Sequence, residues 1–167
     1  MKTMTTFVLI LTATATALIA GLFYAYSCSV NPGLGKLSDE NYILAMQSIN
    51  REILNPVFFA SFMGALLLLP LSTWLQYRTG GGSVAFYILL AATIIYAVGT
   101  FGVTMLGNVP LNEALDRFNA DSASMEEIAK QRNTFEIPWN KLNNIRTIAN
   151  IVSLVLVIVA CLNVSRD

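Results

Sequence analysis

Four long apolar segments, separated by polar stretches, divide the sequence. They cover residues 7–26, 53–75, 84–105 and 147–164, and no segment contains a charged residue. A helix needs roughly 20 apolar residues to cross the hydrocarbon of a bilayer, where the backbone has to satisfy its own hydrogen bonds. The pattern therefore predicts an all-α fold, a four-helix transmembrane bundle that forms one domain over residues 1–167.

Two longer connections, residues 27–52 and 107–146, lie at the same end of the predicted bundle because they follow the first and third spans. We call this end the long-loop end and expect short helices in both connections. In the first connection, a helix should run from about Asp39 toward the second span. Asn55 followed by Pro56 indicates either a kink or a new N-cap with proline at the first helical position.

The second long connection also carries helix-start signals. Asn108 is placed to cap a helix that begins near Val109, with a proline in its first turn. Ser124 and Glu127 have the spacing of a capping box, in which each side chain accepts a hydrogen bond from the other residue's backbone N–H. We therefore expect two helical segments between the third and fourth spans.

Amide and arginine side chains gather where these connections meet the membrane. Gln47, Arg51 and Asn55 are four residues apart and would share one stripe of a continuous helix. Each residue by itself also fits a cap, a snorkelling cation or an interfacial aromatic residue. Their convergence from three separate stretches of the chain at the long-loop end predicts a pocket. The candidate site residues are Asn31, Gln47, Asn50, Arg51, Asn55, Asn108, Asn112, Trp139, Asn143 and Arg146.

The end of the second connection gives the most regular part of this pattern. Trp139, Asn143 and Arg146 follow one another at i, i+4 and i+7, so they share one face of the helix that enters the last span. Asn150 lies one turn further on and is the polar residue inside a span that we expect to reach the same cavity.

Composition narrows the chemistry. The chain is 55% hydrophobic and 12% charged, with zero net charge, so it favours a lipid bilayer as surroundings and gives no indication of nucleic-acid binding. It contains no histidine, which excludes a histidine base and histidine-bound metals. We expect no metal and no cofactor. Cys28 and Cys161 belong to opposite ends of the bundle, so we expect two free thiols.

Several stretches together resemble one known family. They are "GLFYAYSCSVNPGL", "AMQSINREILNPVFFASFMG", "NVPLNEAL" and the pattern formed by Trp139, Asn143, Arg146 and Thr147. The whole chain resembles the DUF1772 or anthrone oxygenase family of small four-span membrane proteins. Leu142 replaces a second tryptophan of the family pattern, Asn144 replaces a frequent histidine, and Asn31 replaces an apolar residue. These departures concern the chemistry and the substrate rather than the fold.

The resemblance implies an oxidoreductase, a monooxygenase that oxidises an anthrone or a similar phenolic compound with dioxygen and no cofactor. Catalytic roles would fall to Arg146, Asn143, Trp139, Asn108 and Asn112, and substrate binding to Gln47, Asn50, Arg51, Asn55 and Asn31. Amide and guanidinium N–H groups suit a developing oxyanion, but an arginine cannot act as the base. The base is left open among Glu52, Glu113, Glu136 and water.

Two other functions stay open beside the enzyme. The same pocket would suit a non-catalytic membrane protein that binds a small aromatic molecule, a quinone or a lipid headgroup. A purely structural tetraspan protein is the other alternative. Self-association into a homo-oligomer is also open. For a bacterial source, we expect a multi-pass protein of the inner membrane.

Overall fold

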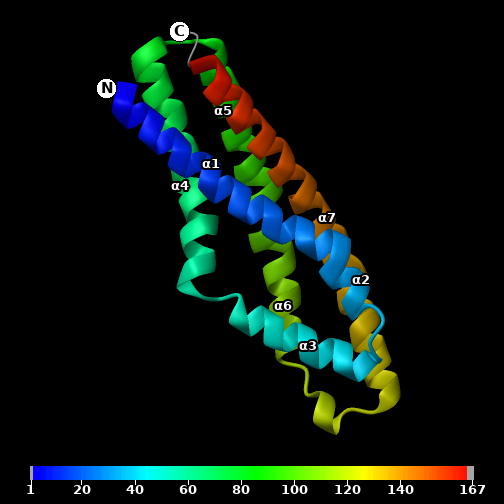
Figure 1. The fold of residues 1–167 in the computed structure, drawn as a ribbon. Helices are drawn as coiled ribbons and strands as arrows, with labels where there is room; N and C mark the ends of the chain where they lie inside the picture. Colours follow the sequence, from blue (N-terminus) through cyan, green and yellow to red (C-terminus); the bar gives the residue numbers. More distant parts are fainter. Residues whose placement is uncertain (1, 165–167) are drawn as a thin grey trace.

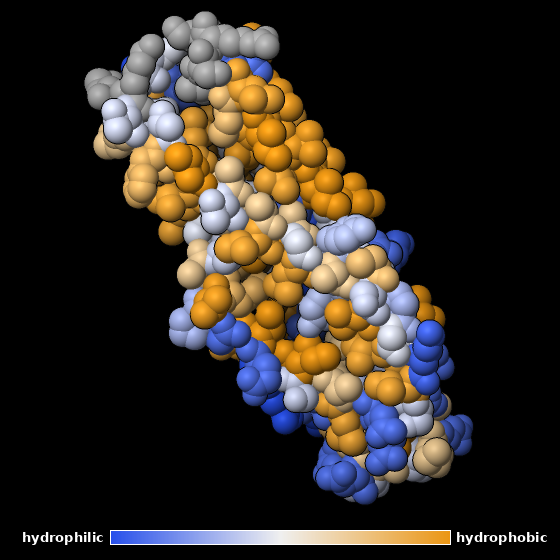
Figure 2. Space-filling model, viewed as in Figure 1, coloured by the Kyte–Doolittle hydropathy of each residue, from blue (hydrophilic) through white to orange (hydrophobic). Residues whose placement is uncertain are grey.

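Four long helices form the computed structural model, which describes residues 2–164 (Figure 1). The helices that are long and apolar enough to cross a membrane are Thr3–Leu34, Pro56–Gly80, Val84–Asp116 and Met125–Asn163. The predicted all-α bundle of four transmembrane helices is therefore confirmed, and the chain is a multi-pass membrane protein. Figure 2 shows apolar side chains over much of the bundle and hydrophilic ones concentrated at its lower end.

The helices are subdivided by short segments with wider or tighter turns. In chain order the elements are α1 (Lys2–Ala25), η1 (Tyr26–Val30), α2 (Asn31–Leu34), α3 (Asp39–Glu52), α4 (Pro56–Gly80), α5 (Val84–Ile95), η2 (Tyr96–Gly102), η3 (Thr104–Asn108), α6 (Val109–Asp116), η4 (Ala120–Ser122) and α7 (Met125–Val164). Both ends of the chain lie near the turn between α4 and α5, whereas α2, α3 and α6 lie at the long-loop end (Figure 1).

The second membrane helix begins at a new N-cap. Asn55 Oδ1 accepts the N–H of Phe58 at 3.0 Å, and Asn55 Nδ2 donates to the Glu52 carbonyl at 2.7 Å. Pro56 takes the first position of α4, where its missing N–H costs no helical hydrogen bond. The N-cap alternative thus holds, and α3 is a separate helix that crosses the long-loop end (Figure 1).

The predicted caps of the second long connection have different outcomes. Ser124 N–H donates to Glu127 Oε2 at 2.8 Å and Glu127 N–H donates to Ser124 Oγ at 3.3 Å, which confirms the capping box. The prediction that Asn108 caps α6 is wrong. Its backbone is already helical, at φ −67° and ψ −39°, and its side chain accepts no capping hydrogen bond, because η3 continues directly into α6.

Three segments of π-helix, η1, η2 and η3, lie within the first and third membrane helices, and the sequence patterns did not predict them. Pro32 follows η1 and Pro110 follows η3. A proline removes one N–H donor and crowds the carbonyl four residues earlier, so a wider turn before it relieves that crowding. In both segments the closing N–H, of Asn31 or of Val109, reaches the carbonyl five residues back. Such wide turns shift the face to which the following side chains point.

A buried apolar core at the long-loop end attaches α3 to the helices around it. Its buried members are Tyr42, Ile43, Met46, Leu115, Ala120, Ile128, Phe135 and Trp139. Arg132 also holds the chain before α3, and it donates to the carbonyls of Gly35 (2.9 Å) and Leu37 (2.8 Å) and to the carboxylates of Asp39 (2.8 Å) and Glu136 (2.7 Å). Burial, and then the charge of Glu136, raises the pKa of Tyr42, so that this core residue stays neutral. The long-loop end is therefore a packed part of the fold.

Gly99 in the third span packs closely against α7. A Cβ added there would lie 2.6 Å from the Cβ of Ala149, which is attached directly to the backbone of α7 and cannot rotate away. We expect Gly99→Ala to lower the free energy of unfolding by about 1–3 kcal/mol, because the two helices would have to move apart. Thermal unfolding of both proteins in one detergent measures the effect.

Gly21 provides the matched control, since a Cβ added there meets nothing within 4 Å. Gly21→Ala should raise stability by up to about 1 kcal/mol through helix propensity alone. Equal effects of the two substitutions would contradict the close packing of η2 on α7.

Candidate functional site

Arg146 lies almost fully buried on α7, with 7% of its surface exposed. Its Nε and Nη2 donate to Asn143 Oδ1 at 3.1 and 3.0 Å. The guanidinium carbon lies 4.2 Å from the ring centroid of Phe23 and 5.1 Å from that of Trp139. The four ion pairs within residues 2–164 all involve other arginines. A buried cation without an acidic partner is costly, which marks this group as a candidate for ligand binding.

Asn143 orients this arginine. It is fully buried, and its Nδ2 donates to Ser27 Oγ at 2.9 Å. Ser27 Oγ also lies 3.0 Å from Thr147 Oγ1, which donates to the Asn143 carbonyl at 2.7 Å. Because the amide nitrogen is held by Ser27, the amide oxygen points to Arg146. The predicted face of Trp139, Asn143 and Arg146 therefore exists as one buried surface between α7 and the first span.

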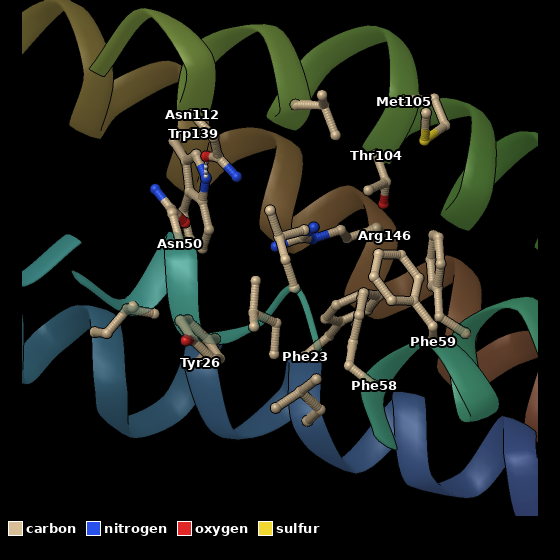
Figure 3. A pocket seen from close by; sticks show the side chains of 16 residues that line it. Phe23, Tyr26, Asn50, Phe58, Phe59, Thr104, Met105, Asn112, Trp139 and Arg146 are labelled. Atoms are coloured by element: carbon tan, nitrogen blue, oxygen red, sulfur yellow. Dashed lines mark hydrogen bonds between the residues drawn. The ribbon is translucent and has the colours of Figure 1, made fainter. Parts of the chain in front are cut away.

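A cavity of about 100 Å³ lies beside Arg146, and we call it the inner chamber. It is lined by Leu22, Phe23, Tyr26, Ile49, Asn50, Ile53, Leu54, Phe58, Phe59, Phe62, Thr104, Met105, Val109, Asn112, Trp139 and Arg146. Figure 3 shows Arg146 reaching into the middle of this group, with Phe58 and Phe59 on one side and Asn50, Asn112 and Trp139 on the other. Its lining, mostly apolar with a few polar groups, has the composition of a small-molecule site.

The wall formed by Trp139 is held by amides of the third span. Trp139 Nε1 donates to Asn112 Oδ1 at 2.8 Å, and its ring lies 5.8 Å from that of Tyr26. Asn108 is buried and donates to the Trp139 carbonyl at 3.5 Å, and it does not line the inner chamber. Asn112 thus lines the chamber, whereas Asn108 lies outside it and contacts the backbone of α7.

The side chains of Gln47, Arg51 and Asn55, which were predicted to share one stripe, make contacts in separate places. Gln47 donates to the carbonyls of Leu115 and Phe118, both at 2.8 Å, and so completes the end of α6. Asn55 caps α4, and Arg51 forms an exposed ion pair at 2.6 Å. The expectation that these three line one pocket wall is wrong, because the helix ends before Asn55 and the α3 face that carries Gln47 packs on α6. Of Gln47, Asn50, Arg51 and Asn55, Asn50 is the one that lines the inner chamber.

Two other expected members of the pocket lie elsewhere. Asn31 faces a separate polar hollow with Ser27, Asn140, Asn144 and Glu136, on another side of α7. Asn150 is fully buried between helices and lines no part of the inner chamber, which corrects that expectation. Neither Oδ1 nor Nδ2 of Asn150 has a hydrogen-bond partner among residues 2–164.

Several aromatic walls of the chamber were missed by sequence reasoning. Phe23 and Tyr26 are three residues apart, and Phe58 and Phe62 are four apart, so each pair shares a helix face. Such spacing was visible, but lipid-facing and cavity-facing aromatics look alike in a helix that is apolar all round. The polar neighbours of Phe23, supplied by α7, come from more than 100 residues further along the chain.

No metal site accompanies this chamber: within residues 2–164 no three Cys, Asp or Glu side chains lie close enough together to hold an ion. The three glutamates considered as bases also lie outside the inner chamber. Glu136 pairs with Arg132 and Glu113 with Arg117, while Glu52 is exposed at the end of α3.

The fold and the chamber together define a small multi-pass membrane protein with a buried cationic site. The sequence model of the anthrone oxygenase family matches residues 56–156, which is more than half of the chain. The chain belongs to this family. The matched part includes Phe58, Asn112, Trp139, Asn143 and Arg146, and it begins after α3. No curated protein and no solved structure matches the chain significantly.

Proposed function

We propose that the protein oxidises an anthrone or a similar phenolic aromatic compound with dioxygen, without a metal or an organic cofactor. The observation that carries this proposal is the buried guanidinium of Arg146, which has no ion-pair partner among the described residues and lies beside an aromatic chamber. Membership of the anthrone oxygenase family supports the same reaction class.

The reaction balances without a cofactor. An anthrone has a carbonyl group opposite a CH₂ group, and loss of one CH₂ proton gives an anion whose charge lies largely on the carbonyl oxygen. Dioxygen takes four electrons from the CH₂ carbon. One oxygen atom forms the new carbonyl group, and the other leaves as water with the two hydrogens. The protein has to bind the ring, stabilise the anion and admit dioxygen.

Arg146 is suited to stabilising the anion. A guanidinium has five N–H donors, of which Asn143 accepts two, so that three are free for the oxyanion. Pre-oriented donors in an apolar chamber stabilise developing negative charge strongly, since little reorganisation accompanies the reaction. Phe23 and Trp139 cover the guanidinium, which directs a ligand oxygen toward its free N–H groups.

Water is the proton acceptor in this proposal. Arg146 stays protonated and cannot be the base. Glu52, Glu113 and Glu136 do not line the inner chamber, as described above. Stabilisation of the anion by Arg146 lowers the pKa of the bound anthrone, so a weak base suffices.

The test is turnover of anthrone by the purified protein in lipid nanodiscs under air. We expect oxygen uptake and quinone absorbance above the rate in empty nanodiscs, which accounts for spontaneous oxidation. With ¹⁸O₂, the new carbonyl group should carry one labelled oxygen. A rate equal to that of empty nanodiscs would refute the enzyme; if anthrone or quinone still bound, the non-catalytic binding protein would replace it.

A further inference from the structure

We propose that the ligand site has a second chamber, and that Asn50 selects ligands with an uncharged oxygen substituent reaching into it. This inference rests on the proposed function for the inner chamber. The outer chamber has a volume of about 250 Å³ and lies between α3 and α6. It is lined by Asn50, Arg51, Leu54, Val109, Asn112, Glu113, Asp116 and Arg117.

The two chambers share a wall. Asn50, Leu54, Val109 and Asn112 line both of them, so a ligand that passes these four residues occupies both. The inner chamber, at about 100 Å³, is smaller than the roughly 150 Å³ cavity that holds one benzene ring. A ligand with several rings therefore has to extend beyond it, and the outer chamber lies in direct continuation.

The charges of the outer chamber are already paired. Arg51 lies 2.6 Å from Asp116, and Arg117 lies 3.2 Å from Glu113, with both pairs largely exposed to water. A carboxylate or ammonium group on the ligand would have to compete with one of these pairs. An uncharged polar substituent meets no such competition, so the chamber favours a neutral group that forms hydrogen bonds.

Asn50 supplies the selective contact. Its Nδ2 is buried and has no hydrogen-bond partner in the described part of the chain. Across the shared wall, Asn112 Oδ1 already accepts from Trp139, as Figure 3 shows. A buried N–H donor without a partner is unfavourable, and an oxygen on the ligand would satisfy it. The required group is therefore an acceptor, such as an ether, a hydroxyl or a carbonyl oxygen.

Fluorescence of Trp139 offers a direct binding measurement. The chain has two tryptophans, and Trp74→Phe on the outer surface leaves Trp139, in the wall of the inner chamber, as the reporter. Quenching would be measured in nanodiscs under argon, which prevents oxidation. The probes are anthrone and its methoxymethyl, carboxy and aminomethyl derivatives. We expect the methoxymethyl derivative to bind about three- to tenfold more tightly than anthrone, and the charged derivatives no more tightly than anthrone.

Substitutions at position 50 test the residue itself. Asn50→Leu and the isosteric Asn50→Asp both remove the donor, and both should bring the affinity ratio of methoxymethyl anthrone to anthrone close to one. Asn41→Leu changes an exposed asparagine of the same helix and should leave the ratio unchanged. Because the aspartate is isosteric, misfolding of the leucine variant would not prevent the comparison.

The outcomes separate this inference from the proposed function. If anthrone binds but the methoxymethyl derivative has no advantage, or keeps its advantage in both Asn50 variants, the selection of oxygen substituents by Asn50 is refuted while the enzyme proposal stands. Tightest binding of a charged derivative would refute the preference for an uncharged substituent. If no probe binds at all, the aromatic site proposed for the inner chamber fails as well.

Discussion

Arg146→Met should abolish anthrone oxidation and at the same time raise the thermal stability of the protein. The substitution removes the donor that stabilises the oxyanion, and loss of such a donor typically lowers turnover by about 10²–10³-fold. It also removes a buried cation that has no acidic partner among residues 2–164, and the desolvation of such a cation costs several kcal/mol. Asn143 Oδ1 would lose its two donors, a penalty of about 1–3 kcal/mol. Since the desolvation that is relieved is larger than the penalty at Asn143, the ligand-free protein should become more stable.

Turnover under air and the midpoint of thermal unfolding without ligand measure the two effects on the same preparation. Arg146→Lys is the control, because it keeps the charge but loses the planar fork and its contacts with Phe23 and Trp139. We expect weak residual turnover and no gain in stability from the lysine. A methionine variant that is less stable than the wild type would show that Arg146 has a structural role.

Asn143→Asp should reduce turnover by about a hundredfold while the protein stays folded. The introduced carboxylate would occupy the place of Oδ1, where Arg146 already donates twice, and would neutralise the guanidinium. The Ser27 hydroxyl lies 2.9 Å from the amide nitrogen and is able to turn its own hydrogen toward the new oxygen. A ligand anion would then compete with an internal ion pair, so binding of the anion weakens.

The matched control is Asn144→Asp, the same change one residue later. Asn144 is exposed and faces the polar hollow on another side of α7, so turnover should stay within a factor of about two. Turnover rates and anthrone affinities of the wild type and of the two variants measure these effects. Wild-type turnover in Asn143→Asp would mean that the positive charge of Arg146 does not act on the ligand.

Local features of the fold could be predicted because each depends on neighbours in the chain. The four spans follow from uninterrupted apolar segments, since backbone in lipid has to form helices. The capping box of Ser124 and Glu127 depends on a three-residue spacing. The common face of Trp139, Asn143 and Arg146 depends on the helical repeat alone, and α7 runs through all three without a break.

Features that depend on two helices meeting could not be predicted in the same way. Asn50 and Gln47 are both amides of one helix, yet Gln47 completes the end of α6 and Asn50 lines the ligand chamber. A rotation of α3 about its axis would exchange these positions without any change in sequence pattern. The wide turns of η1 and η3 likewise shift the inward faces of the first and third spans, and no periodicity in the apolar segments indicates them.

The sequence by itself determined the four membrane helices, the absence of histidine chemistry and the buried face of α7 that carries Arg146. Only the tertiary structure decided that Arg146 has no acidic partner in the described part of the chain, that Phe23 and Trp139 cover it, and that Asn50 lines the chamber beside it. The physical reason is that hydrogen bonding within a helix is local, whereas the surroundings of a buried charge are set by side chains from distant parts of the chain.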